Sequence, residues 1–103
     1  MKTIMIVDND SDVFTHMKLF ALEKNIEIIQ AKNSRHGVTT LDANPDVKLI
    51  LIHTKCPETN QPAYFSLKPG ANLKTTSDDP ADFLKKPFSK EEFKTFIEQK
   101  MRN

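Results

Sequence analysis

Residues 4–10, with the sequence IMIVDND, decide how this chain is expected to fold. An apolar run of this kind is typical of a buried strand, and it breaks sharply into an acidic loop that begins at Asp8. Asp10 or Ser11 can cap a helix that follows the loop, because both side chains accept hydrogen bonds from free backbone N–H groups. The stretch therefore predicts a strand from Lys2 to Val7, a short loop, and then a helix.

The same strand–helix pattern repeats along the chain. A second strand is expected from Ile26 to Gln30, and a helix from Ser34 to about Ala43. Val47 to Ile52 is the most continuous apolar strand, as expected for the middle of a parallel sheet. Ser89 and Glu92 form a capping box that predicts the start of a final helix. This alternation with short links favours one doubly wound α/β domain over residues 1–103.

The stretch between Pro57 and Pro80 is compatible with two interpretations. In the preferred one, a third helix starts at Gln61-Pro62 and a weak fourth strand runs from Asn72 to Thr76. In the other, Ala63 to Leu67 is the fourth strand and there is no third helix. The first is preferred because a parallel crossover needs a covering element. In the preferred interpretation, the helix that would follow the fourth strand is expected to be missing or replaced by a loop, and which of the third and fourth helices is lost stays open.

Composition limits the classes of function. The 103 residues have 38% hydrophobic and 28% charged side chains and a net charge of +1, so neither nucleic acid nor an anionic membrane is expected as a partner. The single cysteine, Cys56, cannot form an internal disulfide and fits a reducing compartment. With neither a secretory signal nor a membrane-length apolar run, a cytoplasmic location is expected.

Two stretches together resemble the receiver domains of bacterial response regulators. Residues 81–88, ADFLKKPF, are similar to the end of the last strand in that family, and residues 4–10 are similar to its first strand and acidic pocket. The resemblance implies a flavodoxin-like, parallel five-stranded sheet of order 2-1-3-4-5. It also implies a pocket made from Asp8, Asn9, Asp10, Thr76 (or Thr75) and Lys86, with a Lys86-Pro87 peptide bond that is often cis.

The chain departs from the family at the positions that carry its chemistry. His53 occupies the place of the phosphorylated aspartate, and Asn9 replaces one of the carboxylates that hold Mg²⁺. Because Mg²⁺ prefers anionic oxygen ligands, its binding is expected to be weak or absent, and no other cofactor is expected. His53 and Lys86 are only 33 residues apart, which is shorter than the usual family interval.

These departures predict a degenerate receiver, or pseudo-receiver. It would act in signal transduction as a phosphorylation-independent protein-interaction module, and it would not be an enzyme. The partner is expected to be a signalling protein, with a homodimer as a further option. The expected surface combines the final helix, including an exposed Lys94, with the loop from Pro69 to Pro80.

Two alternatives remain open at the level of the sequence. One is a receiver phosphorylated by an unorthodox route, for instance on His53. The other is a small metal or redox sensor built on the His53 and Cys56 pair, although zinc sites normally have three or four protein ligands. His16 and His36 stand on separate expected helices and add no second spaced pair. A nucleotide or flavin site is disfavoured, because the loop after the first strand is acidic and has no glycine.

Overall fold

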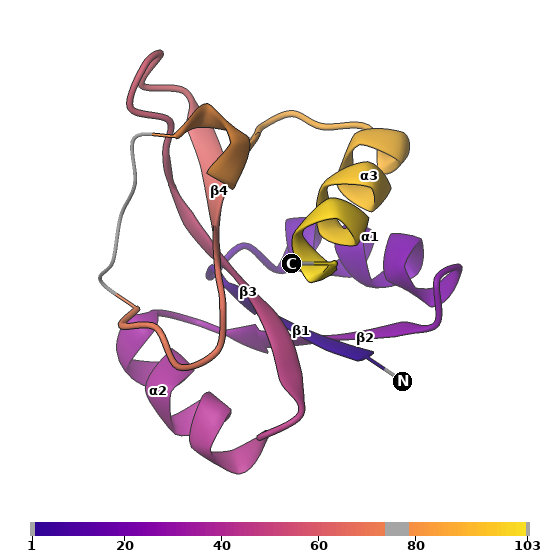
Figure 1. Ribbon diagram of the computed structural model, residues 1–103, viewed down its shortest axis with the longest axis vertical. Coiled ribbons are helices and arrows are strands. Elements are labelled where there is room, and N and C mark those ends of the chain that lie inside the picture. The colour runs from indigo at the N-terminus through magenta and orange to yellow at the C-terminus, as the bar shows by residue number, and fades with distance from the viewer. Residues whose placement is uncertain (1, 74–78, 103) are drawn as a thin grey trace.

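The computed structural model describes residues 2–73 and 79–102, and over them the chain forms a mixed α/β fold with three helices (Figure 1). A short 3-10 turn, Pro80–Asp82, precedes the last strand. The remaining elements are β1 (Lys2–Val7), α1 (Ser11–Leu22), β2 (Ile26–Ala31), α2 (Ser34–Ala43), β3 (Val47–Lys55), β4 (Pro62–Leu67), β5 (Phe83–Lys85) and α3 (Lys90–Met101).

The five strands form one sheet in the order β2-β1-β3-β4-β5. This order confirms the prediction and is consistent with a flavodoxin-like fold. β1 is parallel to both β2 and β3. β4, however, is antiparallel to both of its neighbours, so the expectation of an entirely parallel sheet is wrong for this one strand.

The direction of β4 follows from the short link that precedes it. Cys56 and Gln61 close a tight hairpin, in which the Cys56 N–H donates to the Gln61 carbonyl at 2.7 Å. Asn60 adopts a left-handed backbone conformation with φ of 57°, which asparagine tolerates better than most residues. A hairpin reverses the chain, whereas a parallel neighbour would need a crossover of about a dozen residues or more.

The preferred interpretation of the middle region is therefore wrong, and the alternative is confirmed. Residues 62–67 form a strand and not a helix, because they pair along their whole length with β3. Asn72 and Leu73 lie outside any strand, and the rest of the strand expected there lies outside the described residues. No helix intervenes between β3 and β4 in the described part of the chain.

The sheet separates two hydrophobic clusters. α1 and α3 pack on one face, where Phe20 and Phe93 have ring centroids 6.1 Å apart, and α2 covers the opposite face (Figure 1). Gly37 lets α2 approach closely, since a Cβ at this position would lie 3.1 Å from Leu73 Cδ1 and 3.4 Å from Met5 Cε. Close packing is thus the reason for a glycine within this helix.

Ion pairs connect the outer sides of α1 and α3. Glu23, just after α1, accepts hydrogen bonds from both Lys90 and Lys94 of α3. Lys24 pairs with Glu98 at 2.6 Å. The side chain of Lys94 is only 14% exposed, so the expectation that Lys94 lies on a free surface is wrong.

The helices begin where the sequence predicts. Asp10 caps α1 by accepting from the backbone N–H groups of Asp12 and Val13 at 3.0 and 3.2 Å. Ser89 and Glu92 form the expected capping box of α3. Among the described helices, none has both the length and the apolar character needed to span a bilayer.

Candidate functional site

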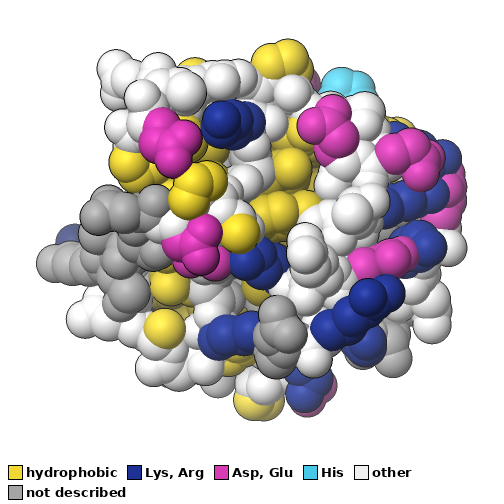
Figure 2. Space-filling view, turned by 45° about the horizontal axis from the view of Figure 1, so that its top comes forward, with side chains coloured by type: hydrophobic (Ala, Val, Ile, Leu, Met, Phe, Trp, Pro, Cys, Tyr) yellow, Lys and Arg dark blue, Asp and Glu magenta, His cyan; other side chains and the backbone are white. Residues whose placement is uncertain are grey.

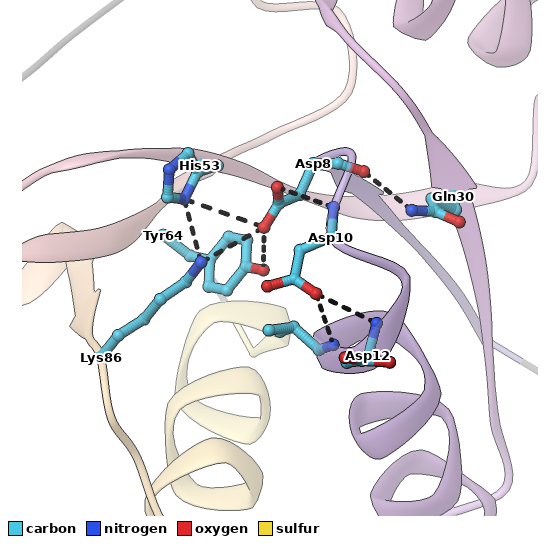
Figure 3. Close-up of polar contacts among 8 residues, drawn as sticks. Asp8, Asp10, Asp12, Gln30, His53, Tyr64 and Lys86 are labelled. Carbon is cyan, nitrogen blue, oxygen red and sulfur yellow. Dashed lines mark hydrogen bonds and ion pairs between the residues drawn. The ribbon is translucent and has the colours of Figure 1, made fainter.

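Four polar side chains come together where β1, β3 and β5 end, three from these segments and a fourth from β4. Asp8 follows β1, His53 lies on β3, and Lys86 follows β5. Tyr64 joins them from β4, where it pairs with His53 in the sheet register. Figure 3 shows these side chains converging on one oxygen of the Asp8 carboxylate.

Asp8 is the centre of the site and is the one buried charged residue in the described chain, at 6% exposure. Its Oδ2 accepts a hydrogen bond from the Tyr64 hydroxyl at 2.5 Å and pairs with Lys86 Nζ at 3.2 Å. Its Oδ1 accepts from the backbone N–H of Asp10 at 3.2 Å. Both carboxylate oxygens therefore have partners within the protein.

Lys86 connects this carboxylate to the other side of the pocket. Its ammonium group lies 3.0 Å from His53 Nδ1 and 4.3 Å from the centroid of the Tyr64 ring. Backbone contacts hold the segment, since Lys86 N–H donates to the Pro62 carbonyl at 2.8 Å and Gln61 Nε2 donates to the Lys86 carbonyl at 2.5 Å. The Lys86-Pro87 peptide bond is cis, as the resemblance implied.

The surroundings shift the pKa of both Asp8 and Tyr64. Burial raises the pKa of Asp8, but hydrogen bonds from Tyr64 and the Asp10 N–H, with the charge of Lys86, lower it below the ordinary value of 3.8. Burial and the hydrogen bond to Asp8 raise the pKa of Tyr64 well above its usual range. The phenol thus remains a neutral donor to an ionised carboxylate at neutral pH.

The polar residues next to Asp8, Asn9 and Asp10, do not join it as ligands. Asn9 and Asp10 are exposed, and the Asp10 carboxylate is used as the cap of α1. Pro87 lies in the loop after β5. Thr76 and Thr75, the expected hydroxyl residues of the pocket, lie outside the described residues.

These residues do not fit a Mg²⁺ ion. A cation at Asp8 would have to displace Tyr64 and Lys86 from Oδ2, and it would then face the Lys86 ammonium group. Asn9 supplies only a neutral oxygen where the resemblance calls for a carboxylate. The ion would then bring a second cation beside the Lys86 ammonium group, with a single buried carboxylate to balance both charges.

The second expected pair, His53 and Cys56, does not converge. Cys56 is 1% exposed and packs in the hydrophobic cluster beneath α2. The side chain of His53 is 47% exposed and lies beside Tyr64, which belongs to the other cluster. No group of three metal-ligating side chains occurs among the described residues. The geometry therefore gives a metal or redox sensor at this pair no support.

Tyr64 is the residue that the sequence interpretation missed. The helix predicted from Gln61-Pro62 contains Tyr64, and on a helix its hydroxyl would have no reason to approach Asp8. Once residues 62–67 form a strand antiparallel to β3, Tyr64 stands opposite His53 and points to the same side of the sheet. The alternative interpretation, with a strand from Ala63 to Leu67, could have identified Tyr64, because pairing of this strand with β3 is enough to place the side chain beside the pocket.

An apolar groove of about 670 Å³ adjoins the polar cluster. Its wall from α1 includes Phe20 and His16, and its other wall includes Pro87 and Phe88. Lys86 borders both the groove and the polar cluster, so the two are contiguous.

Comparison with known proteins identifies no relative: the chain matches no family model, no curated protein and no solved structure.

Proposed function

We propose that this protein is a pseudo-receiver: a receiver-like domain that has lost its phosphorylation chemistry and acts by binding another protein. It takes part in signalling in the cytoplasm without acting as an enzyme. The proposal rests on the fold and on the residues around Asp8, and it extends the resemblance of residues 4–10 and 81–88 to function.

One observation carries the proposal: each oxygen of the Asp8 carboxylate already has a partner from the protein itself. Tyr64, Lys86 and the Asp10 N–H occupy both of its oxygens. His53 stands where a phosphorylated aspartate would be needed. A pocket closed by its own side chains is a structural element that holds β1, β4 and β5 together, and it supports a surface whose shape does not depend on phosphate.

The distribution of charge favours a protein as the partner. Figure 2 shows one face of the molecule, on which basic and acidic side chains alternate without a large patch of one sign. The net charge is only +1. Binding to nucleic acid usually relies on a concentrated basic surface, which this face does not present.

The first test is a ¹⁵N NMR titration with Mg²⁺ and beryllofluoride, which mimics an aspartyl phosphate. We expect no saturable shift of the amide signals of Asp8, His53 or Lys86, because the carboxylate is already occupied. A specific, saturable shift at these residues would show that the pocket still binds metal or a phosphoryl analogue, and would overturn the proposal.

The interaction surface is proposed to lie on α3 and the edge of the sheet. A shallow groove of about 380 Å³ has Leu84 and Phe96 in its floor and Glu91 and Thr95 at its rim. Glu91 and Thr95 are exposed, and replacing them leaves the Lys94–Glu23 pair in place.

This location can be tested with a partner identified by crosslinking. Glu91→Lys and Thr95→Arg are expected to weaken its binding at least tenfold in a titration, whereas Lys18→Glu on α1 should leave it unchanged. Unchanged affinity for every variant of the α3 face would exclude this surface while leaving the pseudo-receiver assignment intact.

A further inference from the structure

Three of the four polar side chains at the end of the sheet, those of Asp8, Lys86 and His53, contact one another in a row. Lys86 Nζ lies between Asp8 Oδ2, at 3.2 Å, and His53 Nδ1, at 3.0 Å. The direct distance from His53 Nδ1 to Asp8 Oδ2 is 3.8 Å. The ring of His53 is about half exposed and in reach of water, whereas Asp8 is buried.

The hydrogen-bond chemistry of lysine fixes the state of the histidine in this arrangement. An ammonium group only donates, so His53 Nδ1 must accept, and the ring is neutral with its proton on Nε2. A proton on Nδ1 would set two donors, both cationic, face to face at 3.0 Å. At the same time it would give His53 a charge that attracts Asp8.

We propose that protonation of His53 exchanges the partner of Asp8, from Lys86 to His53. The charged imidazole closes the gap to Asp8 Oδ2 and takes the place of the ammonium group. Lys86 then leaves the carboxylate and turns towards solvent. Histidine is the side chain whose ordinary change of charge lies between about pH 5 and 8, so the exchange is to be sought across that range.

Every element packed around the ring contributes to this balance. Asp8 comes from β1, Tyr64 from β4 and Lys86 from the segment after β5, while Lys55 lies two residues along on β3. Tyr64 is a neutral donor to the same Oδ2 atom in both states. Asp10, at the start of α1, adds negative charge near Tyr64.

The exchange would be transmitted to the apolar groove. Lys86 and its neighbours Pro87 and Phe88 line one wall of the groove, while Phe20 and His16 belong to the other. Release of Lys86 from Asp8 moves the side chain of Lys86 alone, because the Lys86 backbone stays bonded to Pro62 and Gln61 and the Phe88 ring stays stacked on Phe93. The exchange therefore moves a positive charge at the rim of the groove while the apolar walls stay in place.

The test is an NMR titration of the whole chain from pH 5 to 8. Signals of the His53 ring, the Lys86 side-chain Cε and the Phe88 amide are followed together. We expect all three to shift with one common midpoint. In His53→Gln, whose side-chain oxygen still accepts from Lys86 but does not titrate, the shifts of Lys86 and Phe88 should disappear.

The other histidines serve as controls. His16→Gln removes a titrating group from the groove itself and should leave the Lys86 shift unchanged, and His36 reports any general effect of pH. The proposal fails if His53 titrates without the Lys86 signal following, if it stays neutral down to pH 5, or if the Lys86 shift persists in His53→Gln.

Discussion

At the scale of single residues, the hydrogen bond from the Tyr64 hydroxyl to Asp8 is the contact to explain first. The hydroxyl is a buried donor on a buried carboxylate, and it comes from a strand that runs against its neighbours. Hydrogen bonds to charged groups are roughly twice as strong as those between neutral groups. Tyr64 therefore does for Asp8 part of what a bound cation would otherwise do.

Removing this hydroxyl should weaken the fold without changing its shape. Tyr64→Phe is expected to lower the free energy of unfolding by about 1.5–3 kcal/mol at pH 7, as measured by urea denaturation. Ser66→Ala on the same strand is the matched control. The Ser66 hydroxyl donates to the neutral Asp82 carbonyl at 3.2 Å, so its loss should cost about 0.5–1.5 kcal/mol.

The effect of Tyr64→Phe should also depend on pH. The folded-state pKa of Asp8 is depressed, so its contribution to stability is present above 3.8 and is lost as pH falls through the folded value. Removing the hydroxyl raises that folded value. The difference in free energy of unfolding between the wild type and Tyr64→Phe should therefore become smaller below about pH 4, while the difference between the wild type and Ser66→Ala should not. An equal decrease in both differences would contradict a hydrogen bond from Tyr64 to the ionised Asp8 carboxylate.

The sequence predicted some of the pocket residues but not the contacts that hold them. The resemblance to receiver domains implied a pocket that contains Asp8, His53 and Lys86, and the structure brings these three side chains together. Their partners within the protein were not foreseen. Hydrogen bonds such as Gln61 to Lys86 depend on the geometry of the hairpin, which the sequence pattern does not specify.

At the scale of elements, Asp10 distinguishes a helix cap from a metal ligand. Asp10→Ala should lower the free energy of unfolding by about 1 kcal/mol, because α1 loses the acceptor for two N–H groups. Asp10→Ser should recover most of that loss, since serine is also a good cap. Urea denaturation with and without Mg²⁺ measures both. Stabilisation of the wild type by Mg²⁺ that both variants abolish would show that the carboxylate binds a cation.

The elements that were predicted well are those with strong periodicity and clear ends. α1, α2 and α3 all start at a capping residue, and β1 to β3 are rich in apolar β-branched residues. β4 was misassigned because residues 61–70 carry proline at one end and proline-glycine at the other, which are also signals of a helix. Pairing with β3 overrode these local signals, and no local pattern reports such a tertiary contact.

At the scale of the whole molecule, Glu23 holds together the two helices that cover one face of the sheet. The Lys90 and Lys94 side chains lower the pKa of Glu23 from 4.5 to about 2. Because the folded value is depressed, the contribution is present above pH 4.5 and is lost as pH falls towards 2.

Glu23→Gln should therefore lower the midpoint of thermal unfolding slightly at pH 7 and low salt. The difference from the wild type should shrink at pH 2 and in 1 M NaCl, where exposed charges are screened. Glu27→Gln, at an exposed position on β2, is the control and should show a smaller change. A loss that is independent of both salt and pH would indicate packing instead of charge.

The antiparallel β4 also changes what the chain must do to assemble its sheet. In the hairpin, Lys55 pairs with Pro62 and Ile50 with Leu67, whereas Ile4 of β1 pairs with Leu49. Closing a loop loses more chain entropy as the loop lengthens, so forming the β3–β4 contacts loses less entropy than forming the β1–β3 contacts. Replacing a crossover by a turn thus lowers the contact order on one side of the sheet. The slow, long-range step of folding is therefore the pairing of the parallel strands β1, β2 and β3, and Asp8 follows the first of them.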